Sequence, residues 1–438
     1  EYRIYIKGNI NNTSENSSFE NESFINITPT NTLNLLICGF GNEKSEINAE
    51  RDESQTGRVI NISTFANVTL KDLIISGGYT SEKNGGGIVC TGNLTLDNCE
   101  VSNNSAKYGG GVYVSGGTFT MTGGKISENT SINGEGGGVY VLGGTFTIEN
   151  DALISKNTSC GNGGGVFADG GTITINGGSI SENIFSNNSS GGGGIYLTDT
   201  AHLTMTGGKI SNNYPEDYDL SDNTVGGGVY VSGGAFTMEG GEISNNYGFY
   251  GGGVATLGSF SMSGGTISGN IVTNSSDGRK GNGSAVAVLT GGLFTVSENI
   301  TINGDVYLLN DQTITVSNDF EGGEVMITPN KYANDGVGVQ VLKPIEGPSL
   351  TTEIVRKFEV TPQVLNSNRY AYWYVTAEGK LVEDNIIYVN RGSPEDGDGT
   401  LDKPFITIQE AVNKAINDNS DGSTKFKILL QSNVKDTS

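Results

Sequence analysis

Apolar and polar residues alternate in short stretches through the middle of this chain. Residues 109–129 read GGGVYVSGGTFTMTGGKISEN, with Val, Phe, Met and Ile recurring at alternate positions of three short segments. A period of two predicts β-strands, because successive side chains of a strand point to opposite faces. Pairs of glycines separate the segments, which favours tight turns because glycine readily adopts positive φ. The unit therefore predicts three short strands.

The same unit recurs along the chain as two motifs, one following the other. A Gly-Gly-Gly triplet followed by Val or Ile begins at Gly85, Gly109, Gly136, Gly163, Gly192, Gly226 and Gly251. Each triplet is followed by an Ile/Val-Ser-x-Asn tetrad, whose serines are Ser102, Ser127, Ser155, Ser181, Ser211, Ser244 and Ser268. Each strand can pair in parallel with its counterpart one coil away, at about 4.8 Å. The repeat therefore predicts an all-β fold, a single-stranded parallel β-helix with three sheets.

Equivalent residues of successive coils should stack in columns. The predicted inward columns are Phe119, Phe146, Ile173, Leu203, Phe236 and Phe260, with Met121, Ile148, Ile175, Met205, Met238 and Met262 beside them. A third column, at the corner after the third strand, contains Asn104, Asn129, Asn157, Asn183, Asn213, Asn246 and Asn270. An asparagine there can bond bent backbone groups and the next asparagine, so we interpret this column as structural.

The paired motifs resemble those of a known family. Gly110-Gly111-Val112-Tyr113 followed by Ile126-Ser127-Glu128-Asn129 is similar to the repeats of the polymorphic membrane protein family. The resemblance covers residues 85–303, although this chain has Ile or Val where the family usually has Phe in the second motif. It implies a right-handed parallel β-helix and a surface-exposed, outer-membrane-associated or secreted adhesin with a role in virulence. It carries over no catalytic residue.

The flanks predict further coils and caps. Residues 1–84 alternate less regularly and predict irregular N-terminal coils, whereas residues 85–303 contain the regular repeats. Residues 304–383 predict closing coils and an irregular C-terminal cap that includes Trp373. A cap is expected because an uncovered solenoid end exposes a row of unpaired strand edges.

The tail, residues 384–438, has a different pattern. A strand at 386–389 precedes an Asp-Gly turn and the capping box Thr407-Ile408-Gln409-Glu410, which opens a helix with an apolar face. The expected members of this face are Ile408, Ala411, Val412, Ala415 and Ile416. This arrangement resembles the N-terminal cap of pectate-lyase-like β-helices.

The two ends of the chain match each other in polarity. Residues 425–438 read KFKILLQSNVKDTS and residues 1–14 read EYRIYIKGNINNTS, an offset of 424. We therefore expect the chain to be one period of a tandem array. In that array, residues 384–438 would form the N-terminal cap and first strand of a following module.

Composition and charge narrow the class of protein. Glycine accounts for 68 of 438 residues, but proline for only 8, and no strict Gly-x-y period occurs, which argues against collagen and disordered linkers. The net charge of −23 argues against nucleic acid and anionic lipid as partners, since both attract clustered Lys and Arg. No apolar run reaches the roughly 20 residues of a membrane span. We expect an extracellular or cell-surface protein, with any signal and anchor outside this chain.

Metal-binding and redox residues are sparse. Cys38, Cys90, Cys99 and Cys160 show no CxxC spacing, and we interpret them as free thiols rather than a disulfide framework. His202 is the one histidine and is predicted to lie on a strand. Asp396 and Asp398 are candidate Ca²⁺ ligands in an acidic turn, with a plain turn as the alternative. No other cofactor is expected.

A parallel β-helix also carries polysaccharide lyases and hydrolases, which need converging carboxylates or a Ca²⁺ site beside a base. The tetrad's third residues would lie at one position on successive coils: Asn103, Glu128, Lys156, Glu182, Asn212, Asn245 and Gly269. Acidic and basic residues alternate there, which is typical of a solvated face. We therefore predict no catalytic residue.

One outward column is a candidate ligand-binding stripe. In five of the seven units, the residue after the Val or Ile that follows the triplet is aromatic: Tyr113, Tyr140, Phe167, Tyr196 and Tyr230. Exposed aromatic residues at regular spacing suit sugar rings or a protein surface. The alternative is that these rings stack on one another under the loops that join tetrad to triplet.

The loops between tetrad and triplet vary in length while the repeat does not. We expect them to carry recognition, as loops on a rigid scaffold usually do. The loops concerned are Ser131–Glu135, Ile184–Ser190, Tyr214–Val225 and Ile271–Asn282. The sequence thus favours a non-enzymatic, adhesin-like or structural surface protein that binds a host or neighbouring-cell protein or glycan. The alternative is a carbohydrate-binding or polysaccharide-cleaving β-helix.

Overall fold

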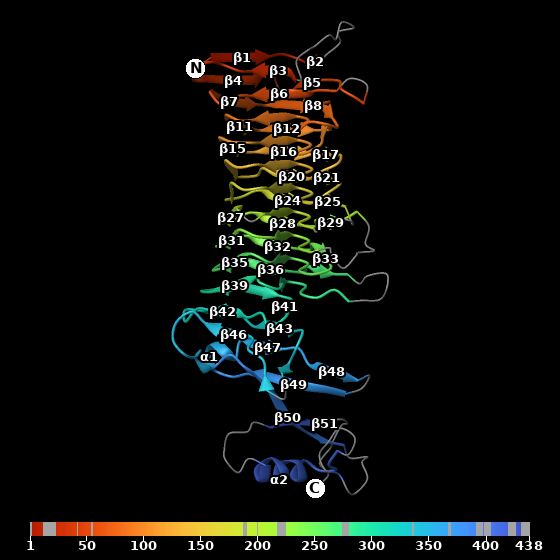
Figure 1. The fold of residues 1–438 in the computed structure, drawn as a ribbon, viewed down its shortest axis with the longest axis vertical. Coiled ribbons are helices and arrows are strands. Elements are labelled where there is room, and N and C mark those ends of the chain that lie inside the picture. Colours follow the sequence, from red (N-terminus) through yellow and green to blue (C-terminus); the bar gives the residue numbers. More distant parts are fainter. Residues whose placement is uncertain are drawn as a thin grey trace.

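The chain forms a slender solenoid in a computed structural model (Figure 1). The structure describes residues 2–11, 23–41, 43–53, 56–186, 191–198, 200–216, 225–273, 280–334, 337–366, 369–390, 397, 404–418 and 426–430. The first coil lies at one end of the solenoid, and α2 with β51 lies beyond the opposite end. Three long parallel sheets run between them, which confirms the predicted parallel β-helix.

Within the described residues the first sheet has 13 parallel strands. They are β1 (Tyr2–Ile6), β4 (Leu33–Gly39), β7 (Ala66–Lys71), β11 (Asn93–Asp97), β15 (Thr118–Met121), β19 (Thr145–Ile148), β23 (Thr172–Ile175), β27 (His202–Met205), β31 (Ala235–Met238), β35 (Ser259–Met262), β39 (Leu293–Val296), β42 (Ile314–Val316) and β46 (Leu342–Pro344).

The second sheet, counted over the same described part of the chain, also has 13 strands. They are β3 (Ser23–Ile27), β6 (Arg58–Ile62), β10 (Ile88–Cys90), β14 (Val112–Val114), β18 (Val139–Val141), β22 (Val166–Ala168), β26 (Ile195–Leu197), β30 (Val229–Val231), β34 (Val254–Thr256), β38 (Val286–Val288), β41 (Asp305–Leu308), β43 (Val325–Pro329) and β47 (Phe358–Val360).

The third sheet is shorter, with 11 strands among the residues described. They are β2 (Ile10–Asn11), β5 (Ser45–Asn48), β8 (Leu73–Ser76), β12 (Cys99–Ser102), β16 (Gly124–Ser127), β20 (Leu153–Ser155), β24 (Ser179–Ser181), β28 (Lys209–Ser211), β32 (Glu242–Ser244), β36 (Thr266–Ser268) and β40 (Thr301–Asn303). The looser N-terminal coils therefore belong to the same three sheets as the regular repeats.

The predicted inward columns form the core. Phe119 pairs in register with Phe146, and their rings stack at 4.6 Å between centroids. All members of both predicted columns are buried, each at the same strand position as its neighbour. Each coil thus buries its apolar face against the coils above and below, as a solenoid requires.

A fourth, narrow sheet follows the asparagine corner and was not predicted. Its strands are only two residues long: β9 (Tyr79–Thr80), β13 (Ser105–Ala106), β17 (Thr130–Ser131), β21 (Thr158–Ser159), β25 (Ile184–Phe185) and β29 (Tyr214–Pro215). A further parallel pair, β33 (Tyr247–Gly248) and β37 (Ile271–Val272), continues the same position. Each unit therefore contributes four strands, rather than the three expected.

The repeat motifs determine the corners of each coil. The first glycine of every predicted triplet has a positive φ, between 62° and 69°, which L-residues with side chains rarely adopt. The second glycine of the triplet leaves no room for a side chain, since a Cβ on Gly137 would lie 2.5 Å from the carbonyl oxygen of Thr158. The tetrad's third residue also has positive φ in every unit, including Glu128, Lys156 and Glu182. The column interpreted as a solvated face is therefore also a backbone corner.

The solenoid closes with antiparallel elements. These are β44 (Ala333–Asn334) with β45 (Val337–Gly338), α1 (Thr352–Val355), and the strands β48 (Gln363–Asn366), β49 (Arg369–Val375) and β50 (Leu381–Val389). Thr351 caps α1 by accepting a hydrogen bond from the backbone N–H of Ile354 at 3.2 Å. Val375 and Leu381 are buried in the solenoid core, so this region covers the core as expected.

The tail forms a strand, a helix and a strand. The N-terminal half of β50 pairs antiparallel with β49, and its C-terminal half pairs in parallel with β51 (Phe426–Leu430). The predicted boundary at residue 384 therefore falls inside one continuous strand. The capping box is confirmed, because Thr407 accepts from the N–H of Glu410 and Glu410 accepts from the N–H of Thr407 at the start of α2 (Ile408–Asp418).

The apolar face of α2 is narrower than predicted. Ala411 is buried against β50 and Ala415 packs beside it, whereas Ile408 and Ile416 are exposed. Val412, the remaining predicted member of this face, is half-buried.

Candidate binding surface

The loops of variable length all leave the solenoid at one corner. Their predicted first residues, Ser131, Ile184, Tyr214 and Ile271, belong to the short strands β17, β25, β29 and β37 and not to loops. Three of the loops return at Gly191, Val225 and Asn282, where single parallel bridges link Gly191 to Val225, Val225 to Tyr250 of the short connection after β33, and Tyr250 to Asn282. The parts at 187–190, 217–224 and 274–279 lie outside the described residues. Each of these three inserts therefore begins at a short strand and ends at a bridged residue. We call the line of bridged residues, Gly191, Val225, Tyr250 and Asn282, the insert ridge.

The aromatic stripe lies beside this ridge on the outer face of the second sheet. The register places Tyr113, Tyr140, Phe167, Tyr196 and Tyr230 in one column. Neighbouring ring centroids are 4.9 to 5.2 Å apart, and the last pair is edge-to-face. All except Tyr196 are buried. The rings therefore stack on one another, as the alternative interpretation had it, and offer little area to a ligand.

Residues next to the glycine triplets cover the stripe. The Tyr108 ring lies 5.3 Å from that of Tyr140, and Val225, which begins the return of one insert, packs in a cluster with Tyr230. Burial raises the pKa of Tyr230 to about 12. Burial also raises the pKa of Tyr140, with the nearby Asp169 carboxylate adding to it, and the Tyr140 hydroxyl donates to Asp169 at 3.3 Å. The aromatic stripe therefore packs against the residues at which the inserts return to the solenoid.

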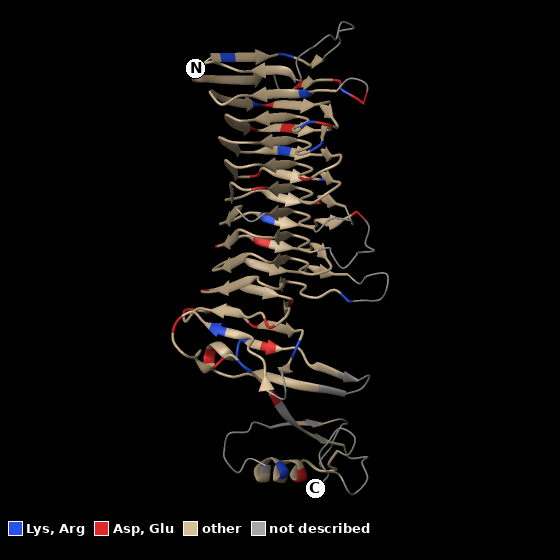
Figure 2. Ribbon diagram, viewed as in Figure 1, with Lys and Arg blue, Asp and Glu red and all other residues tan. Residues whose placement is uncertain are grey.

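Charged residues on the third sheet pair across coils. Figure 2 shows acidic and basic positions scattered along a mostly uncharged solenoid. Lys125 lies 2.9 Å from Glu100, and Lys209 lies 2.9 Å from Glu242, in each case on neighbouring strands. Over the described residues no three His, Cys, Asp or Glu side chains group closely enough to hold a metal ion. Asp396 and Asp398, the candidate Ca²⁺ ligands, lie outside the described residues.

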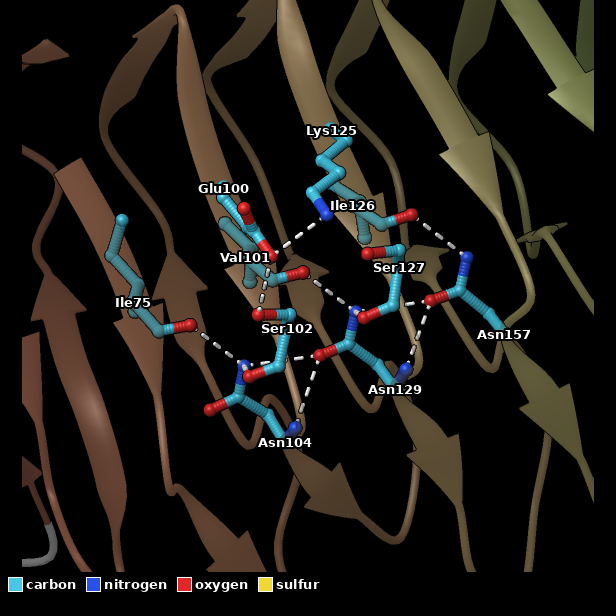
Figure 3. Close-up of polar contacts among 10 residues, drawn as sticks. All are labelled: Ile75, Glu100, Val101, Ser102, Asn104, Lys125, Ile126, Ser127, Asn129 and Asn157. Atoms are coloured by element: carbon cyan, nitrogen blue, oxygen red, sulfur yellow. Dashed lines mark hydrogen bonds and ion pairs between the residues drawn. The ribbon is translucent and has the colours of Figure 1, made fainter. Parts of the chain in front are cut away.

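The asparagine column is a continuous buried ladder (Figure 3). From Asn104 to Asn246, each side-chain Nδ2 donates to Oδ1 of the next asparagine at 2.9 to 3.0 Å. Each also donates to a backbone carbonyl of the preceding coil, as Asn129 does to Val101 at 2.9 Å. The predicted structural role is confirmed, because the hydrogen bonds shown here leave each amide donor and acceptor engaged within the ladder.

A hollow near the closing elements was missed at the sequence level. It has a volume of about 580 Å³ and lies among α1, β47 and β49. Its lining includes Arg356, Glu359, Tyr372, Trp373 and Tyr374. The indole N–H of Trp373 donates to Gln363 at 3.2 Å, which fixes the ring at the wall. The run of aromatic residues in β49 was the available signal, but we interpreted it only as cap core.

The cysteines and the histidine are not grouped into a site in the described part of the chain. All four cysteines are free, with Cys90 and Cys99 buried and Cys160 exposed. Burial raises the pKa of the Cys90 and Cys99 thiols to about 12, which makes them poor nucleophiles. His202 begins strand β27 with an exposed side chain, as predicted.

No family model, curated protein or solved structure matches this chain. None of the helices in the described part of the chain is long and apolar enough to cross a membrane.

Proposed function

We propose that this chain is a non-enzymatic scaffold of a bacterial cell-surface or secreted protein, adhesin-like in function. Its binding residues would lie in the inserts of the insert ridge, and its ligand would be a protein or glycan on a host or neighbouring cell. The anchoring of insert ends at one corner, one coil apart, carries this proposal. The similarity of the repeat motifs to those of bacterial surface adhesins supports it.

This geometry suits recognition because the residues that stabilise the coils are not the residues of the inserts, which vary. The core columns, the asparagine ladder and the aromatic stripe repeat from coil to coil, so they hold the ends of each insert rigidly. An insert can then change in length or sequence without disturbing the coils, and several neighbouring inserts can contact one partner surface.

An insert swap tests the proposal. Residues 216–224 are replaced by residues 132–135, the short connection that follows β17 three coils earlier. Binding to a glycan array and to cultured epithelial cells is measured for the full chain and for the swap. We expect the swap to fold like the native chain but to lose binding at least tenfold. Thr147→Ala, on the first sheet, is the control and should bind normally.

A second candidate is carbohydrate binding in the hollow beside Trp373. Aromatic faces next to an Arg and a Glu are the combination that commonly binds sugar rings. Trp373→Ala should then abolish glycan binding, whereas the insert swap should leave it intact. A reducing-sugar assay on the same glycans adds the enzymatic alternative, since turnover would contradict the non-enzymatic proposal.

A further inference from the structure

The first coil of the solenoid has an uncovered edge. β1, β2 and β3 are the outermost strands of their sheets in the described part of the chain. Ile4 pairs with Ile37 in a core column that continues through Leu70, Leu96 and Met121. Ile37 is buried, but Ile4 is 48% exposed, and no strand or helix among the described residues lies over it. Tyr2, two residues earlier on the same side of β1, is 70% exposed.

The opposite end carries the element that this edge lacks. Strand β51 pairs in parallel with β50, with Ile428 opposite Ile387. Ile387, Val389 and Ala411 are buried together, and Ile428 packs against them partly buried. The helix α2 and the strand β50 thus cover the side of β51 on which Ile428 lies.

At the offset of 424, β51 corresponds to β1, residue by residue over the strand. Ile428 then corresponds to Ile4, and Leu430 to Ile6. Ile6 is 6% exposed, whereas Leu430 is 47% exposed. At the equivalent positions, Ile428 is therefore packed against α2 and β50, whereas Ile4 is exposed.

We propose that the free edge of β1 is a docking site for the strand and helix of a preceding copy of this module. The strand equivalent to residues 385–389 would pair in parallel with β1, placing its Ile387 opposite Ile4. The helix equivalent to α2 would cover Ile4, with Ala411 toward it. Successive modules would then join end to end into one continuous solenoid. This proposal is independent of the binding function proposed for the inserts.

Physical reasons, as well as the sequence match, indicate that the strand and helix of a preceding copy cover β1. An open edge of apolar parallel strands is a template for uncontrolled pairing, and proteins normally cover or charge such edges. The unit at residues 385–418 already pairs with a strand of the same pattern in the same orientation. No change of register or of strand direction is needed to place it over β1.

The test places a copy of residues 385–424 directly before Glu1 of the full chain. Hydrogen exchange of the β1 amides is compared with that of the unextended chain. Parallel pairing should slow exchange of the β1 amides that point away from β4 at least tenfold, because they gain acceptors. An extended chain whose β1 exchanges as fast as before, or which is less stable than the unextended chain, overturns the proposal.

Two variants make the test specific. Ile387→Asp in the added copy places a charge at a buried position and should return β1 exchange to the unextended rate. Ile4→Asp should alter the stability of the unextended chain little, but remove the protection gained in the extended chain. Protection of β1 that rises with concentration in the unextended chain would instead show edge pairing between two copies, and would overturn the proposal.

Discussion

The asparagine ladder gives the sharpest test of what stabilises the coils. Asn157 is fully buried and its side chain makes four hydrogen bonds: it donates to the Ile126 carbonyl and to Asn183, and it accepts from the backbone N–H and the amide of Asn129. Asn157→Ala removes all four. The buried N–H of Asn129 is then left without its acceptor.

The magnitude follows from these contacts. Each hydrogen bond contributes about 1 kcal/mol net, and a buried group left unpaired costs about 1 to 3 kcal/mol. Since some partners keep other bonds, we expect Asn157→Ala to lower the free energy of unfolding by about 3 to 5 kcal/mol. The loss should concentrate in the coils around Asn157, because each coil of a solenoid contacts mainly its neighbours.

Urea denaturation followed by far-ultraviolet circular dichroism measures the loss, and hydrogen exchange locates it. Asn176→Ala, at an exposed position near β23, is the matched control and should cost less than about 0.5 kcal/mol. A loss below about 1 kcal/mol for Asn157→Ala, or one no larger than the control, would refute the reasoning.

Asn157→Asp separates donors from acceptors. Its carboxylate can still accept from Asn129, but it faces the Ile126 carbonyl and Asn183 oxygen without a proton to donate. Burial would raise its pKa in the folded state, so its deficit relative to the native chain should be smallest below about pH 4, where the protonated carboxyl still donates one of the two hydrogen bonds, and should grow as the pH rises. A deficit independent of pH between 3 and 7 would contradict the donor assignment.

Three further predictions test the glycine triplet, the tetrad corner and the aromatic stripe. Gly137→Ala places a Cβ 2.5 Å from a backbone oxygen and should lower the free energy of unfolding, measured by urea denaturation, by about 3 kcal/mol or more. In the control Gly116→Ala the nearest atom to the Cβ is 3.8 Å away, and the loss should be less than about 1 kcal/mol. Equal losses in the two variants would contradict the close-approach argument. Glu128→Gly should raise the free energy of unfolding by about 1 kcal/mol, because a left-handed residue with a side chain is strained, and a destabilised variant would count against that strain. Burial raises the pKa of Tyr230 to about 12 in the folded state, so its proton is held more tightly in the folded than in the unfolded chain. Its contribution to stability should therefore be constant below about pH 10 and fall between pH 10 and 12, and the difference in absorbance at 295 nm between the native chain and Tyr230→Phe should show ionisation near pH 12 rather than near pH 10.

The parts of the fold predicted from sequence are those that repeat in register. A buried column such as Phe119 to Phe260 must keep the same kind of residue in every coil, so period-two alternation and glycine spacing are enough to place it. The asparagine ladder was predictable for the same reason. A buried amide needs a partner, and the next coil supplies the same one.

Other features could not be read from the pattern. Two-residue strands such as β13 show no period, so the fourth sheet left no signal of its own. Glu128 and Lys156 look like surface residues, and only their backbone φ shows that they form a corner. Whether Tyr140 is exposed depends on Tyr108 folding over it, which is a contact and not a spacing. The hollow beside Trp373 likewise requires three separate elements to meet.

Binding by the insert-swap chain tests the central claim most directly. The full chain and the chain with residues 216–224 replaced by residues 132–135 are compared on the same glycan array and epithelial cells, after circular dichroism shows that both are folded. We predict that the native chain binds and that the swap loses binding at least tenfold. Equal binding by the two folded chains would contradict the assignment of recognition to this insert of the ridge.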